Sequence, residues 1–202
     1  MEYYFDVLLT KNEGSHNPYH NTFHTITVFV NSYKIAKTEK CSYSQIRNVL
    51  IAALFHDFNH SGGKKPDSEN IKEAISKFLE YSQESEQTNE TIIEIIKSTE
   101  YPYIIKESDL NLEQRIIRDA DITQMYTDNF LQQVIFGLLV QEQGLTLKEA
   151  IETQLKFMNY IHPLTKYGNE LCDKYLNKRF ADVLYINKII RKEYNNESKT
   201  KK

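Results

Sequence analysis

The chain has 202 residues, a formal net charge of −3 and only two cysteines. This length predicts one domain, residues 1–194, followed by a charged flexible tail, residues 195–202. The mixed charge argues against a surface for duplex nucleic acid, and the absence of a long apolar run or basic leader argues against a membrane protein. We therefore expect a soluble cytoplasmic protein that acts on a small ligand, and the oligomeric state stays open.

Apolar residues recur at helical spacing in the first half of the chain. A first helix is predicted over residues 17–36, with Asn and Pro as its opening residues. A second runs over residues 44–57 and is ended by the glycines at 62–63. Asp67 is predicted to cap a third helix, which carries apolar residues over 71–79.

The second half continues this pattern. Residues 82–89 are polar and predict a loop, residues 92–102 contain an isoleucine-rich helix, and residues 110–126 predict one further helix. Thr and Glu at the start of residues 146–161 resemble a capping box, and an amphipathic helix includes residues 180–186. The predicted fold is therefore all-α, a compact single-domain helical bundle.

Two histidines lie four residues apart in the stretch Tyr-His-Asn-Thr-Phe-His. On a helix, His20 and His24 would project from one face, which suits two imidazoles that share a cleft. Two partly exposed histidines bonded to neighbours would produce the same spacing. His16 precedes Pro18, and we assign it no role.

An adjacent His-Asp pair, His56-Asp57, closes an apolar helix. Charge at a buried helix end is costly without a partner, and a divalent cation can be that partner. Imidazole nitrogen and carboxylate oxygen are both suitable ligands for such an ion. The alternative is a pair that faces water at the helix terminus.

Two aspartates, Asp119 and Asp121, lie in an otherwise apolar helical segment. Because they are two residues apart, they point about 200° away from each other, and only one can face the core. The neighbouring residues do not settle which one does, and a solvated surface position is expected for Asp119. With Asp121 facing inward, His24, His56, Asp57 and Asp121 would supply four metal ligands of mixed nitrogen and oxygen type.

At this point the sequence resembles a known family. His24, His56-Asp57 and Asp121 resemble the ligand set of the HD-domain metal-dependent phosphohydrolases. More narrowly, Tyr-His-Asn-x-x-His at 19–24 and His-Asp-x-x-His-x-Gly at 56–62 resemble the class I cyclic nucleotide phosphodiesterases of animals. That family has His-Asp-x-Asp-His, and here Asn59 replaces the second aspartate. The resemblance spans roughly residues 19–165.

The resemblance implies two divalent metal ions. Zinc or manganese would bind the four ligands named above, and magnesium or manganese would share Asp57 and complete its coordination with water. The catalytic residues would be His20, as the general acid that protonates the leaving sugar oxygen, and His60, which would support the site from behind the ligands.

The same resemblance implies a base-binding position. The family has a glutamine that bonds the purine and, three residues later, a stacking phenylalanine, and Gln154 and Phe157 stand at this spacing. Tyr19 would also contact the substrate. Lys64 and Lys65 could meet phosphate, although a solvated loop is the more ordinary interpretation.

The sequence thus predicts a phosphodiesterase that hydrolyses a cyclic nucleotide or cyclic oligonucleotide signal to a linear nucleotide, with a hydroxide held between the metals as nucleophile. Within the same superfamily, the alternatives are a nucleotide 5′-phosphomonoesterase and an alarmone hydrolase. From other classes, they are a non-catalytic nucleotide sensor or sponge and a purely structural helical protein.

Overall fold

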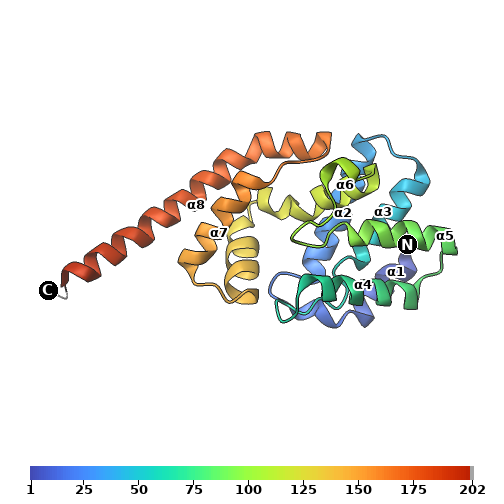
Figure 1. Ribbon diagram of the computed structural model, residues 1–202, viewed down its shortest axis with the longest axis horizontal. Helices are drawn as coiled ribbons and strands as arrows, with labels where there is room; N and C mark the ends of the chain where they lie inside the picture. The colour runs from blue at the N-terminus through green and yellow to red at the C-terminus, as the bar shows by residue number, and fades with distance from the viewer. Residues whose placement is uncertain (201–202) are drawn as a thin grey trace.

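A computed structural model describes the backbone of residues 1–200 and the side chains of residues 1–190 (Figure 1). Within this part the fold is all-helical, as predicted. Its α-helices are α1 (Glu2–Lys11), α2 (Thr22–Thr38), α3 (Tyr43–Phe55), α4 (Asp67–Tyr81), α5 (Glu86–Lys97), α6 (Leu112–Asp121), α7 (Leu147–Tyr160) and α8 (Lys166–Thr200). Side chains of the proposed tail, residues 195–202, lie outside the described residues, and the tail stays a prediction.

Short helical segments of other types join these α-helices. Three are 3-10 helices: η1 (Glu13–His16), η2 (Glu107–Asp109) and η3 (Ile122–Tyr126). The segment η4 (Leu131–Glu142) is a π-helix, a type that is rare and often found at functional sites. None of the described helices combines the length and apolar character needed to cross a membrane.

The first hydrophobic core is built around α3. Ser42 and Gln45 form a capping box at its start, and the seven residues 49–55 that follow are all buried. This run is buried all round because α1, α2, α5 and α6 pack against α3. The helix thereby carries its C-terminal histidine, His56, into the interior.

A second hydrophobic core joins Tyr19, η3, η4, α7 and α8. In Figure 1, α8 begins close to α2 and α6, and α7 and the later part of α8 lie at the opposite end of the molecule from α1, α4 and α5. The chain passes from the first core to the second where α6 ends, because Ala120 belongs to the first and Met125 to the second. Asp121 lies at this junction as the last residue of α6.

The first predicted helix begins later than expected. The side chain of Asn21 accepts a hydrogen bond from the His24 amide and caps α2, so Asn17 and Pro18 lie outside the helix. His20 and His24 therefore do not share a helix face, and that prediction was wrong.

Other boundaries also differ from the prediction. Ser85 caps α5, which makes the loop expected over 82–89 shorter, and the helix expected over 110–126 changes to 3-10 geometry after Asp121. Asp67 is the first residue of α4, after Pro66, instead of its cap. The helix α1 and the π-helix η4 were not predicted.

Candidate metal centre and active site

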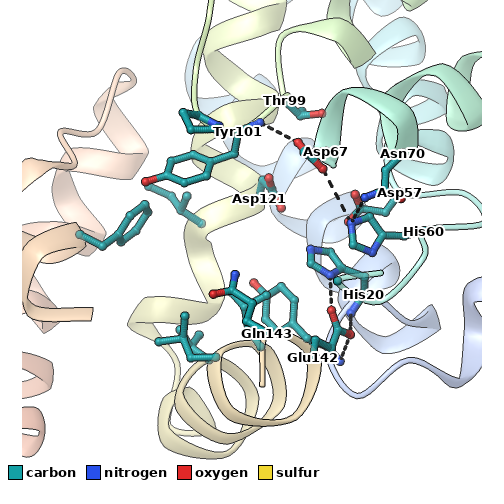
Figure 2. A pocket seen from close by; sticks show the side chains of 18 of the residues that line it. His20, Asp57, His60, Asp67, Asn70, Thr99, Tyr101, Asp121, Glu142 and Gln143 are labelled. Atoms are coloured by element: carbon teal, nitrogen blue, oxygen red, sulfur yellow. Dashed lines mark hydrogen bonds and ion pairs between the residues drawn. The ribbon is translucent and has the colours of Figure 1, made fainter. Parts of the chain in front are cut away.

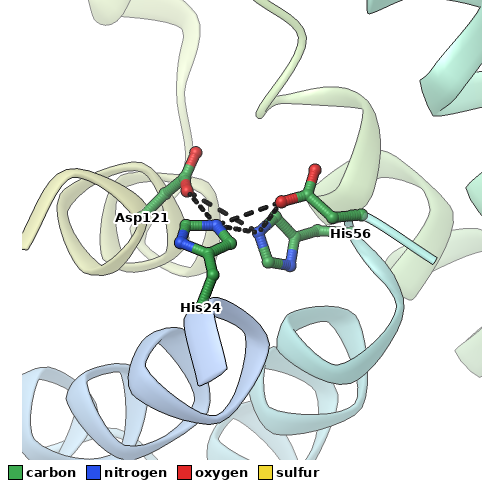
Figure 3. Close-up of side chains that lie close together, drawn as sticks. His24, His56 and Asp121 are labelled. Atoms are coloured by element: carbon green, nitrogen blue, oxygen red, sulfur yellow. Dashed lines mark hydrogen bonds and ion pairs between the residues drawn. The ribbon is translucent and has the colours of Figure 1, made fainter. Parts of the chain in front are cut away.

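Four side chains from three parts of the fold meet at one point. His24 lies in the first turn of α2, His56 and Asp57 follow the last turn of α3, and Asp121 ends α6. Figure 3 shows His24, His56 and Asp121 pointing toward one another. We call His24, His56, Asp57 and Asp121 the ligand cluster, and its donor atoms all lie within 4.8 Å of one another.

The distances within the ligand cluster suit a shared cation. The Nε2 atom of His24 lies 3.3 Å from Nε2 of His56, 3.0 Å from Oδ2 of Asp57 and 3.1 Å from Oδ1 of Asp121. Donor atoms about 2.1 Å from one ion lie about 3.0–3.4 Å apart in octahedral or tetrahedral coordination. The residues present therefore fit a divalent metal ion.

Both imidazoles are oriented by a bond at their other nitrogen. Nδ1 of His24 lies 2.9 Å from Oε1 of Gln124, and Nδ1 of His56 lies 2.9 Å from the carbonyl oxygen of Ala53. These acceptors hold a proton on Nδ1 and leave the Nε2 lone pair for a ligand bond. Gln124 was not predicted from the sequence, where its one local signal is a glutamine among mainly apolar neighbours.

The charges of the cluster are strongly coupled. Burial alone would lower the pKa of His24, but the carboxylates of Asp121 and Asp57 outweigh it and raise that pKa to about 9. Burial would raise the pKa of Asp57, but the neighbouring imidazoles, first that of His56, hold it well below its ordinary value. Positive charge is therefore strongly favoured at the ligand cluster, as a cation site requires.

His20 is paired with a carboxylate that sequence analysis did not identify. Its Nδ1 lies 2.6 Å from Oε2 of Glu142, and Oε1 of Glu142 accepts hydrogen bonds from the backbone amides of Tyr19 and His20 (Figure 2). Burial would raise the pKa of Glu142, but the bonds and charge of His20 together with the two amides lower it. Glu142 therefore fixes the position and the orientation of the His20 ring.

His60 lies against the ring of His20, with 3.7 Å between the ring centroids. Its Nδ1 accepts a hydrogen bond from the Gly62 amide, and its Nε2 lies 2.9 Å from Nδ2 of Asn70. His20, His60 and Glu142 also have ligand atoms within 4.8 Å of one another, but hydrogen bonds already engage the imidazole of His60 and both oxygens of Glu142. His60 thus supports His20 sterically.

A pocket of about 790 Å³ opens beside the ligand cluster. Asp57, Asp121, His20 and Glu142 line one part, and Gln154 and Phe157 from α7 line another, as does Tyr19. Seven residues predicted from the sequence therefore line one cavity: Tyr19, His20, Asp57, His60, Asp121, Gln154 and Phe157. Gln154 is 3% exposed, and its Nε2 has no hydrogen-bond partner among the described residues. An unsatisfied buried amide at a pocket wall is a feature of ligand sites.

The structure corrects the prediction for Asp119. It is buried, 2% exposed, and its carboxylate accepts hydrogen bonds from the amides of Leu164 and Thr165 and from the Thr165 hydroxyl. Burial raises its pKa to about 6 in spite of these bonds. Asp119 thus joins α6 to the segment that leads into α8, and Asp121 faces the pocket. Both aspartates of this segment therefore point into the molecule.

Two other sequence features have mainly local roles. Asn59 adopts φ of 59°, its Oδ1 accepts from the Glu13 amide, and its Nδ2 donates to Glu73, so it ties η1 to α4. Lys64 and Lys65 are both exposed, and of these two only Lys65 lines the pocket.

Comparison with known proteins agrees with this geometry. A family profile described as HD domain matches residues 23–126, which contain the whole ligand cluster. A crystal structure described as a predicted HD superfamily hydrolase, from an uncultured Thermotogales bacterium, is similar with a TM-score of 0.55 at 17% identity, over 96% of this chain and 92% of that one. No curated protein matches. By its matched residues, its fold and its cluster of two histidines and two aspartates, the chain belongs to the HD domain family.

Proposed function

We propose that the protein is a divalent-metal-dependent phosphodiesterase that hydrolyses a cyclic nucleotide or short cyclic oligonucleotide to a linear nucleotide. The supporting observation is that one pocket contains the carboxylates of the ligand cluster, the His20–Glu142 pair and the base-binding candidates Gln154 and Phe157. HD-domain membership supports metal-dependent hydrolysis, and the motif resemblance to the class I enzymes of animals supports a cyclic diester as substrate.

The charge of the pocket supports metal dependence. Four carboxylates line it, whereas its lining lysines are Lys65 and Lys156. An acidic pocket of this kind repels a phosphodiester. Divalent cations on the ligand cluster would reverse this repulsion, polarise the phosphate and make a bound water more acidic.

His20 is the group that this chain offers for proton transfer. Hydrolysis forms a bond between phosphorus and the oxygen of water and breaks the bond between phosphorus and the sugar oxygen, which then needs a proton. Since Nδ1 of His20 is bonded to Glu142, Nε2 is the nitrogen left to donate it. Glu142 would stabilise the charged ring before transfer.

Gln154 and Phe157 would hold the base. They lie one helical turn apart on α7, so an amide with donor and acceptor atoms stands beside an aromatic face. Binding of a base would satisfy the Gln154 amide nitrogen, which has no protein partner among the described residues. Tyr19, buried against the rings of His20 and His24, would complete the wall.

The test compares substrates on the purified protein with added manganese or magnesium. Linear products from 3′,5′-cyclic AMP, cyclic GMP or a cyclic dinucleotide are expected, and Asp57→Asn should abolish them. Asp173→Asn, at an exposed position on α8, is the matched control and should leave the rate unchanged. Phosphate release from 5′-mononucleotides alone would identify a phosphomonoesterase instead, hydrolysis of an alarmone alone would identify an alarmone hydrolase, and tight binding without product would identify a sensor.

A further inference from the structure

The wall of the pocket formed by α7 extends beyond the base-binding candidates. Thr153, Lys156, Phe157 and Tyr160 all line the pocket, and they follow the i, i+3, i+4, i+7 spacing of one helix face. Along α7 the pocket wall changes from the buried Gln154 to Tyr160, which is 64% exposed. The pocket thus has an inner part at Gln154 and an outer part at Tyr160.

A second aromatic residue borders the outer part. Tyr101 is 48% exposed, and its ring centroid lies 6.0 Å from that of Phe157 at an interplanar angle of 67°. Its backbone amide donates to Asp67 at 2.6 Å, which holds the residue in place beside the pocket (Figure 2). Tyr101 and Tyr160 belong to neither hydrophobic core, and both are exposed beside the pocket.

The outer part also carries positive charge. Lys156 lies one turn before Tyr160 on the same face, and it has no ion pair among the described residues. An ammonium group beside two exposed aromatic rings is a combination that binds a phosphate together with a stacked base.

We propose that Tyr101, Lys156 and Tyr160 form a second nucleotide subsite, so that the substrate carries at least two nucleotides. This inference rests on the proposed function and narrows its substrate to a cyclic dinucleotide or a larger ring. One base contacts Gln154 and Phe157, and the next stacks on Tyr101 or Tyr160. Lys156 contacts the bridging phosphate that is not being cleaved. A cyclic mononucleotide leaves this outer part empty.

The experiment measures the preference for two nucleotides over one. With manganese present, kcat/KM is determined for cyclic di-AMP and for 3′,5′-cyclic AMP, and the dissociation constants of both are measured by calorimetry on the manganese-loaded His20→Ala protein, in which turnover is slow. With the outer part of the pocket intact, cyclic di-AMP should be preferred in both measurements. Tyr160→Ala should reduce this preference roughly tenfold, and Lys156→Ala should also reduce it. Tyr185→Ala and Lys148→Ala, exposed residues outside the pocket, are matched controls that should keep it.

The outcomes separate this inference from the proposed function. If both nucleotides are hydrolysed but the preference is absent or insensitive to Tyr160→Ala and Lys156→Ala, the second subsite is wrong and the phosphodiesterase stands. If neither is hydrolysed but cyclic di-AMP binds more tightly through Tyr160, the subsite stands and hydrolysis is wrong. If cyclic AMP is hydrolysed but cyclic di-AMP is neither cleaved nor bound, only the second subsite is wrong, and if neither nucleotide is cleaved or bound, both proposals are wrong.

Discussion

Glu142 holds one imidazole and two backbone amides at once, from a position 122 residues along the chain from His20. The carboxylate therefore fixes both the position of His20 and the nitrogen that carries its outward proton. A side chain that acts in this way influences the reaction without contacting the substrate's phosphorus.

We predict that Glu142→Gln lowers kcat about 10- to 100-fold, because the amide keeps an acceptor for the backbone but loses the negative charge opposite His20. Metal content, measured by elemental analysis, should be unchanged. Glu152→Gln, at an exposed position on α7, is the control. Loss of metal in the Glu142 variant would show that this carboxylate serves the ions instead of His20.

A second prediction distinguishes the proposed general acid, His20, from the metal ligands. His20→Ala should lower kcat by about 10²- to 10⁴-fold and retain bound metal, because general acid catalysis contributes on that scale. His56→Ala should lose both activity and metal, since its Nε2 points into the ligand cluster. An His20→Ala protein that binds no metal would contradict the assignment of His20 as the acid.

Sequence reasoning reached the ligand cluster because His56-Asp57 and Asp121 interrupt apolar helices, where charge needs a partner. It did not reach Glu142, because a glutamate between two glutamines after an apolar run has no local mark of burial. It placed Asp119 on the surface, because the donors of its hydrogen bonds come from Leu164 and Thr165 in a distant segment.

At the scale of elements, the loop after α3 packs against the end of η4. Gly63 has φ of 77°, and a Cβ atom there would clash with the backbone carbonyl oxygen of Glu142. The loop that follows His60 is therefore in backbone contact with the residue that orients His20. Two glycines with left-handed conformation, Gly63 and Gly144, flank this contact, and only the first is crowded.

These two glycines give a matched test. Gly144→Ala should lower the free energy of unfolding by about 1 kcal/mol, because φ is 68° and nothing lies within 4 Å of the added methyl group. Gly63→Ala should lower the free energy of unfolding by about 2 kcal/mol more than Gly144→Ala, because the added methyl group also clashes with the backbone of Glu142. Chemical denaturation measures both, and equal losses would show that the contact with Glu142 is not needed.

Elements with clear sequence patterns were predicted well. The capping box of Thr146 and Glu149 begins α7 as expected, and the apolar run of α3 ends at His56. The start of α2 was wrong because the amides of Tyr19 and His20 bond to Glu142 instead of continuing a helix. The helix η4 was missed because its apolar residues follow π-helical geometry, which the 3.6-residue period does not describe.

At the scale of the whole molecule, the ligand cluster joins three helices that are far apart in sequence. His24, His56 and Asp121 come from α2, the end of α3 and the end of α6. Four polar groups gathered in a largely buried place favour the folded state only when their charges are matched. Bound metal should therefore contribute to the stability of the entire fold.

Removal of metal tests this directly. A chelator should lower Tm, and manganese at about 100 times its dissociation constant should restore about 2.7 kcal/mol, a shift of roughly 5–10 °C in a chain of this size. Asp121→Asn should reduce the rise in Tm that manganese produces, whereas Asp173→Asn should leave that rise unchanged. A manganese response of the same size in the Asp121 variant would place the ion elsewhere. Thermal denaturation with and without the chelator is the measurement.

The residues that match the HD domain family end at 126, close to where the second core begins. Every member of the ligand cluster precedes that point, whereas Glu142, Gln154 and Phe157 follow it. The metal-ligand candidates and the base-binding candidates of α7 consequently lie in successive stretches of the chain. Substitutions confined to the later stretch are therefore expected to alter which ligand the pocket accepts while the four metal-ligand candidates are inherited unchanged.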